Sequence, residues 1–168
     1  MSLTHADVIA VWGESGVIRV PSADISGSGL PDTAQRILVD VGLPREVEYL
    51  FIYERPARIS SDHGRQHWKI GTDYGTDVCV YTDSGEVVSL SSSGQYPNRF
   101  VNSCLECFVE FLCRVVTERR KFLGLPDYEI DELVERLEAE LRARDADAFE
   151  QPEHWWSVIF EQLRAGLL

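Results

Sequence analysis

Positive charge is scarce in this chain of 168 residues. Lysine and arginine together number 16 against 28 aspartates and glutamates, so the formal net charge is -12 at neutral pH. Proteins that hold nucleic acids or anionic membranes use Lys and Arg to neutralise phosphates. The composition therefore predicts no direct nucleic-acid ligand and no membrane, and it favours a protein partner with a basic face.

Long hydrophobic runs and a disulfide framework are also missing. The first residues, MSLTHADVIAVW, lack the cationic start of a signal peptide, and no stretch approaches the roughly 20 apolar residues of a membrane span. The four cysteines accompany a composition that is 44% hydrophobic, which is enough to form a core without covalent links. We expect buried thiols in a reducing compartment and a cytoplasmic location.

No established catalytic motif occurs either. The chain contains no GxSxG nucleophile turn, no phosphate-binding P-loop and no GxGxxG dinucleotide fingerprint. We expect a protein that is not an enzyme, with no catalytic residue, no cofactor and no metal. One alternative stays open at Cys104 and Cys107, a CxxC pair at an expected helix start, where a helix dipole lowers the pKa of a thiol. Small thiols that fill the core are the simpler explanation, and zinc would need two further ligands.

Two other groups of polar residues invite a metal-site hypothesis. His63 and His67 have the spacing of two ligands on a helical face, but the intervening Gly64 favours a loop. Asp73, Asp77 and Asp83 do not have the alternate spacing of a calcium loop. We interpret these aspartates as turn residues.

The order of the expected elements predicts an α+β fold: one domain over residues 1–168, with a mostly antiparallel sheet packed against a layer of helices. Asp83-Ser84-Gly85 is the strongest turn signal, and Thr4 with Asp7, then Ser103 with Glu106, have the spacing of helix-capping boxes. The acidic helical part, 127–168, is expected to belong to the same domain. Expected strands lie at 17–20, 49–53, 67–71, 78–82 and 86–90, and expected helices start near 4, 31, 103, 127 and 154.

Several short motifs, taken in order, resemble the SUKH superfamily of bacterial immunity proteins, and most closely its fourth family. They are Trp12, Leu30-Pro31, Gly42-Leu43-Pro44, VYTDSGEVVSL, FVNSCLECF and Trp155-Trp156. The resemblance implies an antitoxin without a catalytic centre, which binds and neutralises the toxin domain of a polymorphic toxin system, often a nuclease or a nucleic-acid deaminase. Cys104 departs from the more usual NSSL pattern of the family. A regulatory or scaffold protein of the same fold, which binds endogenous cytosolic proteins, is the alternative.

The expected partner surface lies in the acidic part of the chain. Between Asp127 and Glu153 eleven carboxylates face three arginines, and a solvated helix face is the ordinary explanation of such a run. If the partner is a nuclease or deaminase, the same face could occupy its basic cleft. Trp155 and Trp156 lie about 100° apart on a helix, so we expect one of them at a rim. The exposed candidates for partner binding are Glu132, Glu135, Glu138, Glu140, Asp145 and Asp147.

Overall fold

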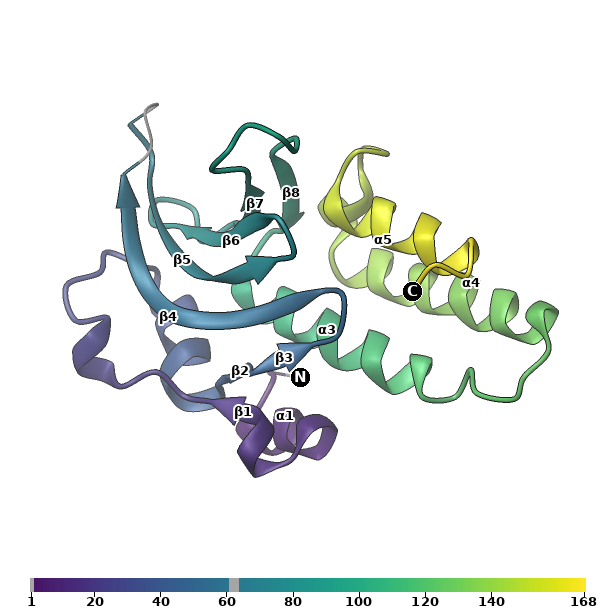
Figure 1. Ribbon diagram of the computed structural model, residues 1–168. Helices are drawn as coiled ribbons and strands as arrows, with labels where there is room; N and C mark the ends of the chain where they lie inside the picture. The colour runs from purple at the N-terminus through teal and green to yellow at the C-terminus, as the bar shows by residue number, and fades with distance from the viewer. Residues whose placement is uncertain (1, 61–63) are drawn as a thin grey trace.

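A computed structural model describes residues 2–60 and 64–168 and shows helices packed against a strongly curved antiparallel sheet (Figure 1). The predicted α+β class is confirmed. None of the described helices is long and apolar enough to cross a membrane. The helices are α1 (His5–Trp12), α2 (Asp32–Arg36) with a π-helical continuation (Ile37–Val41), α3 (Leu105–Arg119), α4 (Asp127–Arg144) and α5 (Trp155–Arg164), with short 3-10 turns at Glu14–Gly16, Ser22–Asp24 and Ala146–Phe149. The strands are β1 (Val17–Ile18), β2 (Leu43–Pro44), β3 (Glu46–Val47), β4 (Phe51–Ser60), β5 (Gln66–Asp73), β6 (Thr76–Tyr81), β7 (Val87–Leu90) and β8 (Arg99–Asn102).

The main sheet is a simple antiparallel succession in the order β3-β4-β5-β6-β7-β8, while β1 and β2 pair separately. The predicted turn at Asp83-Ser84-Gly85 is confirmed. Gly85 has φ 78°, and the strands on either side pair Val80 with Val87. The last strand, β8, was not anticipated, because four residues after a polar loop show no clear alternation.

Helix starts follow the sequence at α1 and depart from it at α3. Thr4 and Asp7 form the expected capping box, in which the Asp7 amide donates to Thr4 Oγ1 and the Thr4 amide donates to Asp7 Oδ2. At α3 the capping side chain is Cys104, so the predicted box between Ser103 and Glu106 is wrong. Glu106 instead accepts the Leu3 amide at 2.7 Å, which ties the N-terminal segment to α3.

Aromatic rings join α3 to both the sheet and α5. Phe108 meets Phe51 of β4 edge to face at 5.5 Å, and Phe111 meets Trp156 at 5.4 Å. The expectation that Trp155 or Trp156 lies at a rim is wrong, because both are buried. Their rings pack perpendicular to each other at 4.7 Å, with the Trp155 indole bonded to Asp73 of β5 and the Trp156 ring against Phe111 of α3.

A buried hydrogen-bond chain connects β8, α3, α4 and α5. The Trp156 indole donates to Asn102 Oδ1 at 2.8 Å, and Asn102 Nδ2 donates to Asp145 Oδ2 at 2.9 Å. Asp145 also accepts the backbone amide of Ser103 at 2.9 Å and the Ser103 hydroxyl. Because Asp145 is only 5% exposed, this carboxylate holds the end of α4 against the start of α3.

We predict that Asp145→Ala lowers the free energy of unfolding by about 2–4 kcal/mol, since it leaves the buried Asn102 amide and the Ser103 amide without an acceptor. Asp147→Ala is the matched control, because Asp147 is an exposed carboxylate two residues away, and it should change the stability by less than about 0.5 kcal/mol. Denaturant titration of both variants measures the difference. Equal stability of the two variants would show that the buried chain contributes nothing.

Candidate functional site

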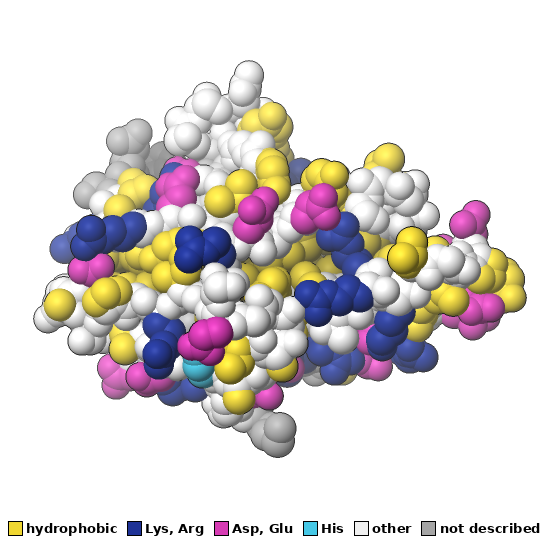
Figure 2. All heavy atoms as spheres, turned by 60° about the horizontal axis from the view of Figure 1, so that its bottom comes forward, with side chains coloured by type: hydrophobic (Ala, Val, Ile, Leu, Met, Phe, Trp, Pro, Cys, Tyr) yellow, Lys and Arg dark blue, Asp and Glu magenta, His cyan; other side chains and the backbone are white. Residues whose placement is uncertain are grey.

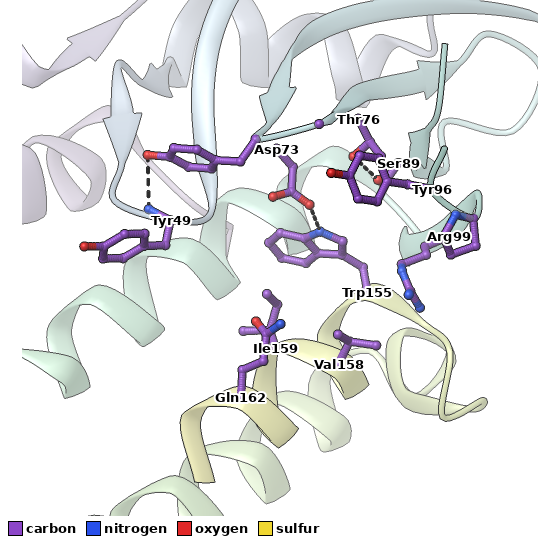
Figure 3. Close-up of a pocket in the computed structure, with 13 residues that line it drawn as sticks. Tyr49, Asp73, Thr76, Ser89, Tyr96, Arg99, Trp155, Val158, Ile159 and Gln162 are labelled. Atoms are coloured by element: carbon purple, nitrogen blue, oxygen red, sulfur yellow. Dashed lines mark hydrogen bonds between the residues drawn. The ribbon is translucent and has the colours of Figure 1, made fainter. Parts of the chain in front are cut away.

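A concave site of about 290 Å³ lies between the β5–β6 hairpin, the loop before β8 and helix α5 (Figure 3). Its lining includes Tyr49, Tyr74 and Tyr96 around the opening, with Asp73 and Trp155 deeper in the hollow. We call this site the tyrosine groove. The three tyrosines are 54%, 54% and 51% exposed, which is unusual for large aromatic side chains gathered in one place.

Three separate turns bring the tyrosines together. Tyr74 and Gly75 form the tip of the β5–β6 hairpin, which Asp73 and Thr76 close as a strand pair. Gly75 permits the close approach of the Tyr96 ring, because a Cβ atom at this position would lie 2.7 Å from Tyr96 Cε2. Tyr49 comes from the turn between β3 and β4, so the groove exists only in the folded chain.

Two of these tyrosines have a backbone conformation that residues other than glycine rarely adopt. Tyr49 has φ 64° and Tyr74 has φ 37°, and no other non-glycine residue among those described has a positive φ. The two residues support each other: the Tyr49 amide donates to the Tyr74 hydroxyl at 3.2 Å, and the ring centroids are 6.3 Å apart. Strain of this kind persists where surrounding structure enforces it, and it concentrates at functional sites.

The inner part of the groove is built around a carboxylate and an indole. Trp155 Nε1 donates to Asp73 Oδ2, and Figure 3 shows Asp73 above Trp155, between Tyr49 on one side and Tyr96 on the other. Burial raises the pKa of Asp73, while the hydrogen bond from Trp155 and the charge of Arg99 partly oppose that shift. The Arg99 guanidinium is itself held by the backbone carbonyl of Glu153.

This chemistry suits binding. The described lining contains no cysteine, histidine or lysine beside Asp73, and its Thr76 and Ser89 hydroxyls are buried and bonded to each other. It offers aromatic faces, tyrosine hydroxyl groups and one carboxylate, a combination that recognises donors and cations, and its one cation, Arg99, is engaged by the Glu153 carbonyl.

The acidic segment is less uniform than its sequence suggests. Asp145 is buried in the hydrogen-bond chain described above, so its expected exposure is wrong. Glu138 is only 15% exposed at its side chain and pairs with Arg142 at 2.8 Å and with Arg164 of α5, so it joins α4 to α5. Both carboxylates were assigned to the surface because a helical pattern does not reveal a neighbouring helix.

The other four predicted partner-binding residues, Glu132, Glu135, Glu140 and Asp147, are exposed. Glu140 is paired with Arg114 of α3. Among the described residues Glu132 and Glu135 make no ion pair, which leaves their charges available to a partner. On the face of the molecule drawn in Figure 2, Lys and Arg side chains alternate with Asp and Glu, and no continuous acidic surface is visible there.

The candidate metal residues do not converge. Asp73 binds Trp155, Asp77 pairs with Lys69 and Asp83 pairs with Arg65. His63 lies outside the described residues, and His67 is buried. No group of three potential metal ligands occurs within the described part of the chain.

Cys104 and Cys107 lie in contact at the start of α3. Their sulfur atoms are 3.2 Å apart, and Cys104 Sγ also accepts the Cys107 amide at 3.4 Å. The hydrogen bond from the Cys107 thiol, aided by this amide and opposed by burial, lowers the pKa of Cys104 to about 6. The same contact, together with burial, raises the pKa of Cys107.

A comparison with known protein families shows to which family the chain belongs. The family model of the SUKH-4 immunity protein matches residues 3–162. The chain belongs to this family. No significant match appears among curated proteins or solved structures.

The tyrosine groove of this SUKH-4 protein was missed in the sequence. Tyr74 stands in a turn-like DYGT segment and Tyr96 in a polar loop, where each aromatic side chain appears isolated. An aromatic residue inside a polar turn was the available signal, because such a residue has no core to fill. Only the structure shows that Tyr74 and Tyr96 lie next to each other and to Tyr49 in one groove.

We predict that glycine is better tolerated than alanine at position 49. Tyr49→Gly should have a free energy of unfolding about 1 kcal/mol above that of Tyr49→Ala, because only glycine adopts a positive φ without strain. At Glu135, an exposed residue in the middle of α4, the order should reverse by a similar amount, since glycine is disfavoured in a helix interior. Denaturant titration of the four variants tests this, and the same order at both positions would argue against strain.

We also predict that Cys104 is the reactive thiol of this SUKH-4 protein. Its rate of alkylation by iodoacetamide should reach half its maximum near pH 6, because thiolate forms as the pH rises through its pKa of about 6. Cys107→Ala removes the main stabilising hydrogen bond and should move the midpoint upward. Mass spectrometry of the labelled peptides identifies the site, and an unchanged midpoint in the variant would contradict the assignment.

Proposed function

We propose that this chain is an immunity protein that binds and neutralises a cognate toxin domain of a polymorphic toxin system, and that it acts in the cytoplasm of the cell that makes the toxin. The observation that supports this most directly is the family match over residues 3–162. We propose that inhibition occurs by binding alone, without catalysis by the immunity protein.

The charge of the protein supports a nuclease or a nucleic-acid deaminase as the toxin. Such an enzyme holds phosphates in a basic cleft, and the net charge of -12 attracts a basic partner. Glu132 and Glu135 of α4 would contribute to this attraction, together with Glu140 and Asp147. Charges of this kind act mainly on the rate of association.

The direct test uses the cognate toxin domain, for which the reading frames beside the gene are to be searched. The purified protein should bind that domain and abolish its activity on nucleic acid, and its expression should protect cells that make the toxin. If wild-type protein neither binds nor inhibits this domain, the proposal is wrong. A growth defect on deletion, without sensitivity to the toxin, would favour a scaffold that binds endogenous proteins.

We predict that the double variant Glu132→Gln, Glu135→Gln slows association with the toxin domain about three- to ten-fold at low salt, because two uncompensated charges no longer steer the encounter. Asp32→Asn with Asp40→Asn is the matched control, since it removes two exposed carboxylates from α2 and its continuation. Stopped-flow measurements at low and high salt give the rates. Equal slowing by both pairs would show an effect of net charge alone and would contradict a role for the α4 face.

A further inference from the structure

We propose that the tyrosine groove is the docking surface for the toxin domain, and that it receives an arginine side chain from a loop of that domain. This inference rests on the proposed function and adds the contact surface and the chemistry of the contact. It moves the main anchor away from the acidic face of α4, which was expected from the sequence.

The first argument is the gathering of exposed aromatic side chains. Among the described residues the other large hydrophobic side chains of comparable exposure are Leu123, Tyr128 and Leu167, and none of them lines the groove. Tyrosine is enriched among the residues that dominate binding energy, because it combines a large apolar area with a hydroxyl group. Three tyrosines around one hollow therefore form a candidate anchor site.

The second argument is preorganisation. The Tyr74 hydroxyl accepts the Tyr49 backbone amide, the Tyr49 ring lies 6.3 Å from the Tyr74 ring, and Tyr96 lies against Gly75. Because the fold already restrains these side chains, the immunity protein loses little conformational entropy when a partner binds to the groove. The positive φ angles of Tyr49 and Tyr74 indicate that the fold maintains this arrangement against local preference.

The third argument selects the occupant. Asp73 is the carboxylate in the lining; its Oδ2 accepts the Trp155 indole, and no hydrogen bond among the described residues occupies Oδ1. Arg99, the cation of the lining, donates from its guanidinium to the backbone carbonyl of Glu153, two residues before the start of α5. A guanidinium can stack on tyrosine rings while it donates to a carboxylate, which fits this set better than a lysine ammonium does. The net charge of -12 also favours a basic partner residue.

Variants of the groove test the docking surface with the cognate toxin domain, after binding of that domain by wild-type protein has been established. Tyr96→Ala and Asp73→Asn should each raise the Kd at least about ten-fold, because they remove an anchor ring and the charge that meets the arginine. Tyr128→Ala, which removes a still more exposed tyrosine on α4, should stay within about two-fold of wild type. Circular dichroism and thermal unfolding verify that each variant is folded.

An arginine scan of the toxin domain identifies the occupant. One Arg→Ala variant should weaken binding, and its effect should be clearly smaller in the background of Asp73→Asn, because a double-mutant cycle then reports a coupling energy between the two side chains, while stacking on the tyrosine rings remains. Arg→Lys at this position should restore binding only in part. Unchanged affinity of the groove variants, or a loss confined to Tyr128→Ala, would overturn the docking surface. Loss of affinity without any arginine coupled to Asp73 would overturn the occupant. Absence of binding by wild-type protein would instead reject the proposed function.

Discussion

The buried hydrogen-bond chain from Trp156 through Asn102 to Asp145 is the constraint on which the placement of the helices depends. Each of these residues comes from a different part of the chain, and each is almost completely shielded from solvent. A buried polar group without a hydrogen-bond partner is costly. The end of α4, the start of α5 and the end of β8 must therefore keep the relative positions in which these three side chains bond to one another. Trp155 follows from this arrangement, because it is the neighbour of Trp156 and is directed toward Asp73 of the sheet. The inner part of the tyrosine groove thus depends on a contact in the interior.

The groove and the acidic face have different physical roles in the proposed function. Exposed carboxylates such as Glu132 act over several ångströms and are screened by salt, so they influence how fast a basic partner arrives. A preorganised hollow lined by tyrosines acts only in contact and influences how long the partner stays. Both features agree with an immunity protein that must capture a toxin domain quickly and hold it.

Departures from ordinary local chemistry in this chain have two different explanations. Cys104 is the N-cap of α3, where its sulfur accepts the Cys107 amide, and this is a position that serine favours in proteins generally. Its lowered pKa then follows from a second thiol at contact distance. At Tyr49 and Tyr74 the backbone has a positive φ, for which glycine is the residue without strain. Glycine would relieve the strain there, but it would also remove the aromatic ring. We therefore connect the tyrosines, and not the thiols, with partner binding.

The sequence by itself determined the α+β class, the turn at Asp83-Ser84-Gly85, the capping box of Thr4 and Asp7, and the family resemblance. These properties are local or follow from the order of motifs, so neighbouring residues suffice to reveal them. Only the tertiary structure decided that Asp145 and Glu138 are not free surface charges, and that Tyr49, Tyr74 and Tyr96 meet. A helical pattern shows which face a residue occupies, but it does not show which other segment covers that face. Exposure and proximity are set by packing between distant segments, and for this reason the candidate site emerged from the fold.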